Sequence, residues 1–196
     1  MNARSERQAE EMLELVGFRL GEEEFGVSIQ DVREIIRMQE VTRVPHAPEF
    51  VEGVINLRGQ VVPIVDLRKR LGMPPKERDR DTRIVIVELD GELVGFIVDA
   101  VTEVLRVPKD QTEPPPEMVV GVDQEYITAV GKLEDRLLIL LDLHKVLSKE
   151  EQKEVKGISA QGELTLEAKI VERPKGEVGT SEKEALGQAK QKALRA

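Results

Sequence analysis

Short apolar segments rich in Val and Ile recur along the first three quarters of the chain. Segments of this length and composition are typical of β-strands, whereas helices are longer and repeat every three to four residues. The dipeptide Asp90-Gly91 separates two of these segments and is typical of a two-residue hairpin turn. The pattern predicts strands at Leu13–Leu20, Glu24–Ile29, Val51–Leu57, Val61–Val65, Arg83–Leu89, Leu93–Val98, Tyr126–Leu133 and Leu137–Leu141.

Only short helices are expected between these strands. The pattern places them around Gln30–Ile36, from Asp66 to Leu71, and after Asp142 through about Val155. Asp66 and Asp142 each come directly after an apolar strand, where an aspartate is a favoured helix N-cap. Residues 108–116 contain three consecutive prolines, which predicts an irregular loop.

The strand pattern occurs twice in the same order. Residues 20–38 align with residues 89–107, and residues 51–67 align with residues 127–143. The alignment pairs polar and glycine positions as well as apolar ones: Gly26 with Gly95, Glu34 with Glu103, Arg37 with Arg106, and Asp66 with Asp142. A duplicated β unit predicts a mainly β fold of two small barrels packed together. We expect a first barrel subdomain over residues 12–80 and a second over residues 81–147.

The composition changes near residue 148. Residues 148–196 contain no aromatic residue and are dominated by Gly, Lys, Glu and Ala. Such a segment buries too little apolar surface to offset the entropy of ordering it. We therefore expect a C-terminal helix from residue 148 and a mostly disordered tail over residues 157–196.

Charge and cysteine content exclude several classes of protein. The net charge of the 196-residue chain is −9, which argues against non-specific binding of nucleic acid. The chain has no cysteine, which excludes a disulfide framework and a thiol nucleophile. No apolar run approaches the roughly 20 residues of a membrane span, and the N-terminus is polar. These features predict a cytoplasmic protein without direct membrane insertion.

No residue pattern indicates an enzyme. The two histidines, His46 and His144, are interpreted as loop or cap residues, and no Ser-His-Asp or metal-ligand spacing surrounds them. The segment Asp79-Arg80-Asp81 is interpreted as a solvated turn, and no glycine-rich phosphate loop occurs. We therefore expect no catalytic residue, no metal and no cofactor.

The two copies differ most at one hairpin. The first copy reads Asn-Leu-Arg-Gly-Gln over residues 56–60, and the second reads Lys-Leu-Glu-Asp-Arg over residues 132–136. The leucine is retained while the tip changes in charge and shape, which is typical of a surface that is free to vary or that binds a partner. Pro63 cannot donate to a ladder, so its strand is expected at a sheet edge or with the missing donor facing solvent. The residues alone leave open whether Arg58 and Asn56 only support the turn.

The run Gly-Val-Ile-Asn-Leu-Arg-Gly-Gln-Val-Val-Pro-Ile-Val-Asp-Leu over residues 53–67 resembles the signature of the CheW family of chemotaxis coupling proteins. Segments 25–29, 32–36, 41–45 and 136–142 resemble the same family in order and spacing. The resemblance covers about residues 12–155 and implies two five-stranded, SH3-like barrels. It implies a non-enzymatic adaptor between the cytoplasmic tips of methyl-accepting chemoreceptors and the regulatory domain of the histidine kinase CheA.

The resemblance also implies which residues bind these partners. The positions that match the family's receptor contacts are Val32, Glu34 and Arg58, with Asn56 adjacent. The positions expected to bind the kinase are Val41 and Gly53. Two other readings stay open at this stage: a scaffold of the same family in a non-chemotactic signalling array, and a plain oligomeric β-barrel protein without a receptor.

Overall fold

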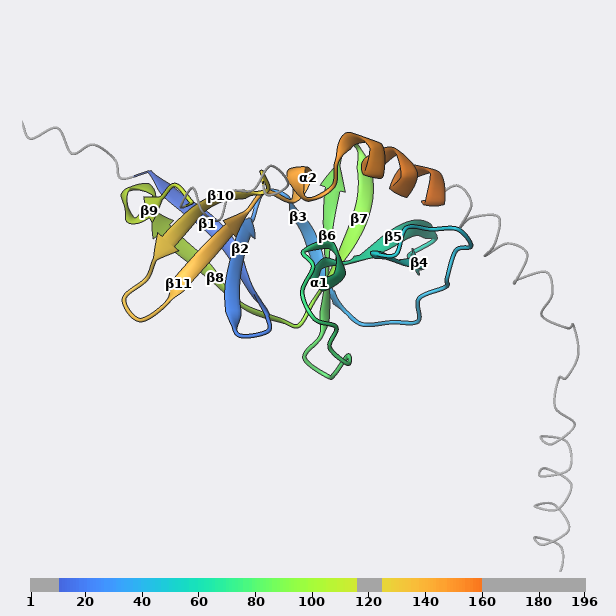
Figure 1. Ribbon diagram of the computed structural model, residues 1–196, viewed down its shortest axis with the longest axis horizontal. Coiled ribbons are helices and arrows are strands. Elements are labelled where there is room, and N and C mark those ends of the chain that lie inside the picture. Colours follow the sequence, from blue (N-terminus) through green and yellow to red (C-terminus); the bar gives the residue numbers. More distant parts are fainter. Residues whose placement is uncertain (1–10, 116–124, 160–196) are drawn as a thin grey trace, which may run out of the picture. The chain divides into compact units, whose positions relative to one another are not determined.

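Two β-sheets form the body of the protein (Figure 1). The structure, a computed structural model, describes residues 11–115 and 125–159. Sheet A has the order β8-β1-β2-β11-β10-β9, and sheet B has the order β3-β6-β7-β5-β4. The strands of sheet A are β1 (Met12–Leu20), β2 (Glu23–Ser28), β8 (Ala100–Pro108), β9 (Thr112–Glu113), β10 (Ile127–Lys132) and β11 (Leu137–Leu141). The strands of sheet B are β3 (Val32–Arg37), β4 (Val51–Leu57), β5 (Gln60–Asp66), β6 (Arg83–Leu89) and β7 (Glu92–Val98).

The two sheets have equivalent strand orders, and each sheet is built from strands of both sequence copies. Apart from the two-residue β9, sheet A joins β1 and β2 of the first copy to β8, β10 and β11 of the second. Sheet B joins β6 and β7 of the second copy to β3, β4 and β5 of the first. The single parallel pairing within each sheet, β2 with β11 and β7 with β5, occupies the same place in both orders. The mainly β fold with two five-stranded units is therefore confirmed.

The subdomain boundaries expected from the repeat do not follow the sheets. Residues 12–80 contribute β1 and β2 to sheet A and β3 to β5 to sheet B, and residues 81–147 are divided in the same way. The chain passes from sheet A to sheet B between β2 and β3, and returns between β7 and β8. A repeat in the sequence gives the strand order within each copy but not which copies pair, because pairing is decided by long-range contacts.

Three apolar clusters fill and join the sheets. One cluster lies within sheet B and includes Ile64, Ile84 and Ile86. A second lies within sheet A and includes Val107 and Leu138. The largest cluster draws on both sheets: Val16, Phe18, Leu20, Phe25 and Val27 of β1 and β2 pack with Val85, Val87, Leu89, Val94, Phe96 and Val98 of β6 and β7. Alternate residues of β6 face different clusters, which explains its continuous apolar sequence.

Three details of the expected strands are corrected. The segment around Gln30–Ile36 is not a helix, because β3 occupies Val32–Arg37, pairs with β6 and alternates in exposure with the period of a strand. Strand β8 was not among the expected strands. Of the two alternatives predicted for Pro63, the edge strand is wrong, since β5 is between β7 and β4. The pairing of β5 with β7 starts only at Ile64, so the ladder does not require a donor from Pro63.

The predicted helix caps are confirmed. Asp66 precedes α1 (Leu67–Arg70) and accepts the Lys69 N–H at 3.2 Å. Asp142 precedes α2 (Leu143–Val146) and accepts the His144 N–H at 3.0 Å. The helix expected after Asp142 is interrupted, because a second helical segment begins only at residue 149 and continues to residue 159.

The C-terminal helical segment is attached to the body of the protein. Ser148 and Glu151 form a capping box, in which the Glu151 N–H reaches the Ser148 hydroxyl at 3.2 Å and the Ser148 N–H reaches the Glu151 carboxylate at 2.7 Å. Val155 and Ile158 are buried in the large cluster. Residues 157–159 are therefore helical rather than part of a disordered tail, and the prediction for residues 160–196 lies outside the described residues. No helix of the described ranges has the length and apolar character that a membrane span requires.

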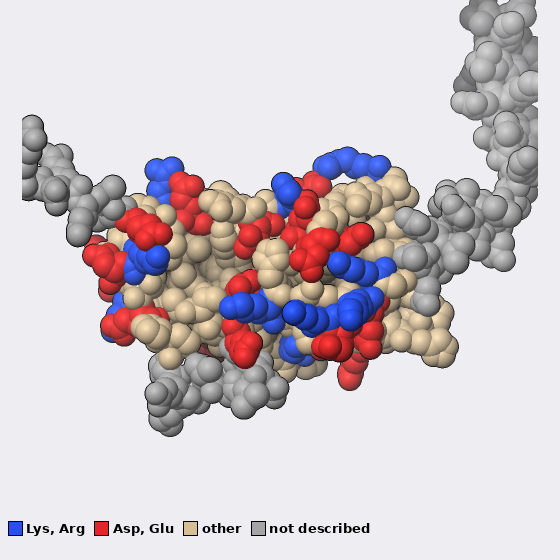
Figure 2. Space-filling view, turned by 90° about the horizontal axis from the view of Figure 1, so that it is seen from above, with Lys and Arg blue, Asp and Glu red and all other residues tan. Residues whose placement is uncertain are grey.

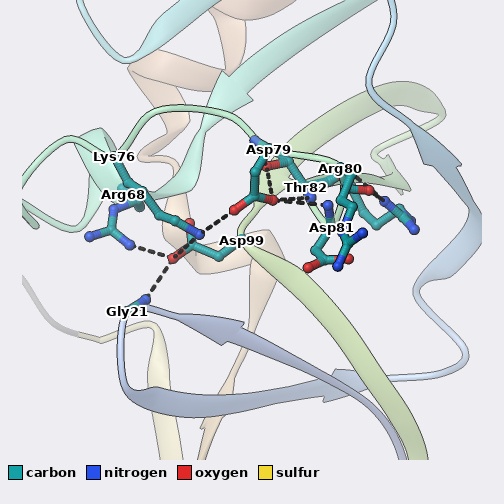
Figure 3. Close-up of polar contacts among 9 residues, drawn as sticks. Gly21, Arg68, Lys76, Asp79, Arg80, Asp81, Thr82 and Asp99 are labelled. Atoms are coloured by element: carbon teal, nitrogen blue, oxygen red, sulfur yellow. Dashed lines mark hydrogen bonds and ion pairs between the residues drawn. The ribbon is translucent and has the colours of Figure 1, made fainter.

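A polar cluster connects elements of both sheets (Figure 3). Asp99, at the passage from β7 to β8, accepts the Gly21 N–H of the β1–β2 turn at 2.7 Å. The same carboxylate oxygen accepts a hydrogen bond from Arg68 of α1 at 2.5 Å and lies 4.0 Å from Lys76. The side chains of Arg68 and Asp99 are only 13% and 12% exposed. Asp99 therefore connects a turn of sheet A to α1, the helix that follows β5 of sheet B.

Candidate functional site

Strand β3 carries two of the residues expected to bind a receptor. Val32 and Glu34 are partly buried, while the intervening Arg33 and the following Ile35 are exposed. Val32 packs against the large apolar cluster. Ile35 is 40% exposed, and it is one of four large apolar side chains of the described strands that are exposed. Sequence reasoning missed Ile35 because Val32, Ile35 and Ile36 have the spacing of one face of a helix, and the segment was interpreted as one.

The β4–β5 hairpin contains the other two residues expected to bind a receptor, Asn56 and Arg58. Leu57 pairs with Gln60, so Arg58 and Gly59 form a two-residue turn. Their φ angles are 52° and 90°, and both are positive, as a type I′ turn requires. The Asn56 side-chain oxygen accepts the Gly59 N–H at 2.7 Å and so fastens the strand end to the turn.

The turn places Arg58 directly against Glu34. Arg58 Nη1 donates to Glu34 Oε1 at 3.0 Å, and Arg58 Nη2 donates to Oε2 at 2.7 Å. Such a two-point contact fixes the orientation of the guanidinium. The hydrogen bond and charge of Glu34 raise the pKa of Arg58 above its ordinary value. Because β3 and β4 are opposite edges of sheet B, the contact also shows that this sheet curves until its edges meet.

We call Val32, Glu34, Asn56 and Arg58 the hairpin site. The Arg58 side chain is 76% exposed, whereas that of Glu34 is 25% exposed. Glu34 engages two of the five N–H donors of the guanidinium, so donors remain for another molecule. The structure therefore brings Glu34 and Arg58 into contact, with Asn56 in the same hairpin as Arg58 and Val32 two residues before Glu34 on β3. It leaves an oriented cation at the surface.

The two residues expected to bind the kinase lie where the segment after β3 pairs with β4. Thr42, next to Val41, exchanges two backbone hydrogen bonds of 2.8 Å with Val54 of β4. Gly53 is buried and has a φ of 141°, and a side chain there would collide with the Thr42 carbonyl oxygen. The structure thus gives Gly53 a backbone role. Val41 is partly buried and packs against the cluster within sheet B.

The equivalent place in sheet A contains a similar contact that sequence reasoning missed. Arg136 of the β10–β11 hairpin lies 2.7 Å from Glu103 of β8 and 2.9 Å from Glu24 of β2. The hydrogen bond that Arg136 donates to Glu103, followed by the charge of Glu24, raises the pKa of Arg136. Glu103 is the repeat partner of Glu34, which was the available signal, but Arg136 aligns with Gln60 rather than with Arg58.

The remaining candidate residues have structural surroundings. His46 is an exposed loop residue, and His144 lies in the first turn of α2, where its Nε2 is 3.5 Å from Asp31. Asp79 accepts the N–H groups of Asp81 and Thr82 at 2.9 and 3.1 Å, which is the arrangement of a turn. Within residues 11–115 and 125–159, no group of three His, Asp or Glu side chains is placed to hold a metal ion.

Comparison with known proteins gives a consistent result. Residues 14–151 match the model of the CheW-like domain. The chain is 41% identical over 138 residues to the chemotaxis protein CheW of Klebsiella aerogenes, covering 70% of this chain and 83% of that protein. It is 36% identical over 142 residues to the chemotaxis protein CheW of Helicobacter pylori, covering 72% and 85%. The crystal structure of the scaffolding protein TtCheW from Thermoanaerobacter tengcongensis superposes with a TM-score of 0.66 at 38% identity, covering 72% of this chain and 96% of that one.

Proposed function

Because the chain belongs to the CheW-like domain family, we propose that it couples chemoreceptors to the histidine kinase CheA in the cytoplasm and catalyses no reaction itself. Its role as a coupling adaptor of chemotaxis follows from the curated relatives and from the scaffolding protein of the same fold. The two partners, the contact residues and the absence of catalysis are our proposal. The observation that carries it is the hairpin site.

The hairpin site suits the side of a helical receptor tip. A helix binds through apolar anchors, and the partly buried Val32 lies two residues before Glu34 on β3. An oriented ion pair contributes register and specificity more than affinity. Because two N–H donors of Arg58 are held by Glu34, the guanidinium is already oriented for a carboxylate or carbonyl oxygen of the receptor.

We place the kinase contact near Val41, where residues after β3 close sheet B against β4. Gly53 supports this contact indirectly, because only glycine lets the Thr42 backbone approach β4. A contact between small β units buries on the order of 1,000 Å² or less and is weak alone. Weak contacts suffice in an array, since many act together.

The charge distribution favours protein partners over nucleic acid. On the face shown in Figure 2, Lys and Arg side chains lie beside Asp and Glu side chains in several places on the described surface. A nucleic-acid surface needs a continuous positive field. Mixed charges instead suit an interface whose orientation is set by individual ion pairs.

Calorimetric titration tests the proposal. The full chain is titrated separately with a purified chemoreceptor tip fragment and with a CheA regulatory domain, and micromolar heats are expected for both. Arg58→Glu should weaken receptor binding by about tenfold or more, since it replaces an attractive charge by a repulsive one. Its heat with the kinase domain should not change.

Arg33→Glu is the matched control. Arg33 lies on the same strand, next to Glu34 in the chain, and is paired with Glu88 at 2.6 Å, with 56% of its side chain exposed. The control makes the same charge change outside the hairpin site, and receptor binding should stay within about twofold of the parent. Normal receptor binding by Arg58→Glu, or equal losses in both variants, would contradict the assignment of the hairpin site. No heat with either partner would favour a scaffold of a different signalling array.

A further inference from the structure

The chain contains two hairpin turns of the same geometry but different sequence. Arg58-Gly59 closes the Leu57–Gln60 pair with φ angles of 52° and 90°. Asp90-Gly91 closes the Leu89–Glu92 pair with φ angles of 50° and 84°. Asp-Gly is a favoured sequence for a type I′ turn, whereas Arg at the first position is not. The second turn therefore shows what this backbone geometry prefers in the same protein.

Arginine is energetically unfavourable at this turn position. An L-residue with a positive φ brings its Cβ close to the carbonyl oxygen, and only Gly, Asn and Asp adopt this conformation readily. The backbone of the turn does not require arginine, since the β6–β7 turn has similar φ angles with aspartate at the first position. Strain of this kind is typically retained where the side chain has a function.

Asn56 stabilises the strained turn from outside it. Its Oδ1 accepts the N–H of Gly59 at 2.7 Å, directly beside the Arg58 peptide. The side chain is at an exposed position, so the hydrogen bond is not required to satisfy a buried group. It holds the turn in the conformation in which Arg58 reaches Glu34 with both Nη atoms.

We propose that Asn56 is a positioning residue that acts through Arg58: it fixes the strained Arg58-Gly59 turn and thereby orients the guanidinium for a receptor. The inference rests on the proposed function for its binding consequence, but the positioning of Arg58 is independent of that function. In this proposal Asn56 does not contact the receptor directly but supports the contact made by Arg58. It also predicts that stability and binding respond in opposite directions when the turn is relaxed.

The first experiment measures the strain. In a Glu34→Gln background, which removes the ion pair, Arg58→Asn should raise the unfolding midpoint by about 2–4 °C, because Asn adopts the turn conformation readily. Asp90→Arg is the matched control in the β6–β7 turn, which has similar φ angles, and it should lower the midpoint by a similar amount. No change, or a decrease, for Arg58→Asn in that background would overturn the strain argument.

The second experiment measures positioning. Asn56→Ala should weaken binding of a chemoreceptor tip fragment about as much as Arg58→Ala, and the double variant should be no weaker than either, because both remove the same interaction. Asn56→Asp retains the acceptor oxygen and should restore most of the binding. Additive losses would overturn the proposal, since they would show that Asn56 acts on its own.

A readout without a partner separates this inference from the proposed function. The guanidinium NMR signals of Arg58 should show restricted rotation in the parent protein and in Asn56→Asp, and free rotation in Asn56→Ala. Restricted rotation in Asn56→Ala would overturn the positioning role. If the NMR result is as expected but Arg58→Ala binds receptor normally, Asn56 positions Arg58 and the proposed receptor site is wrong.

Discussion

Arg58 at the β4–β5 turn and Glu34 on β3 join the two edge strands of sheet B through a pair of hydrogen bonds of 3.0 and 2.7 Å. Arg136 and Glu103 make the equivalent contact between the β10–β11 hairpin and β8 in sheet A. The contact is thus part of the duplicated architecture. The proposal for the hairpin site requires that the first of these pairs also serves recognition, which can be separated from its structural role.

Exchanging the two charges separates these roles. The double variant Glu34→Arg with Arg58→Glu can re-form the ion pair, so its unfolding midpoint should lie within about 2 °C of the parent. Receptor binding should stay at the level of Arg58→Glu alone, because the exposed group would be an anion. Thermal unfolding and calorimetry check the two parts. Recovered binding would mean that the pair matters only for the fold.

Removing the carboxylate of Asp99 should destabilise the connection between the sheets. Asp99→Ala leaves Arg68 and the Gly21 N–H without this acceptor, and both ion-pair side chains are largely buried. We expect a loss of about 2 kcal/mol in the free energy of unfolding, measured by urea denaturation. The exposed pair of Lys109 and Glu11 provides the comparison, and Lys109→Ala should cost less than about 0.5 kcal/mol. Equal effects would show that Asp99 has no special part in joining the sheets.

Adding one methyl group at Gly53 should be much more damaging than adding it at Gly59. Both have positive φ angles, but a Cβ at Gly53 meets the Thr42 backbone while a Cβ at Gly59 has nothing within 4 Å. We expect Gly53→Ala to lower the free energy of unfolding by about 3 kcal/mol or more, and Gly59→Ala by about 1 kcal/mol. Urea denaturation of both variants checks the difference. Kinase binding by Gly53→Ala is interpretable only if the variant remains folded, since the role of Gly53 is in the backbone.

Asp79 should contribute to the acid sensitivity of the fold. A hydrogen bond from Lys76, supported by the Asp81 N–H, lowers the pKa of Asp79 from 3.8 to about 2. A carboxyl with a lower pKa in the folded state stabilises the fold above its ordinary pKa of 3.8, and this contribution is lost as the pH falls toward 2. Asp79→Asn should therefore be less stable than the parent at pH 5, and the difference should disappear near pH 2. Urea midpoints at several pH values test this, and parallel curves at all pH values would contradict it.

Glu52 is also expected to contribute to the acid sensitivity of the fold. Burial alone raises the pKa of Glu52, but hydrogen bonds from Lys69 and Arg78 outweigh it and the pKa is lowered. The ion pairs of Glu52 with these two residues are 2.5 and 2.7 Å long and join β4 to α1 and to the segment before β6. The double variant Asp79→Asn with Glu52→Gln should therefore lose less stability on acidification than Asp79→Asn alone.

The local features of this protein were determined by the sequence itself. Short Val- and Ile-rich segments predicted eight of the described strands, Asp90-Gly91 predicted a turn, and Asp66 and Asp142 predicted helix caps, because each depends on neighbours within a few residues. The repeat predicted two equivalent units, and a family signature over residues 53–67 indicated where to look for the site.

Only the tertiary structure decided which strands pair and which side chains meet. The exchange of strands between the copies, the strand at Val32–Arg37 and the interior position of Pro63 all depend on hydrogen bonds between distant segments. Glu34 and Arg58 are brought together because sheet B curves until its edge strands approach. Pattern and propensity report on near neighbours along the chain, whereas curvature and long-range pairing are set by the packing of the three apolar clusters.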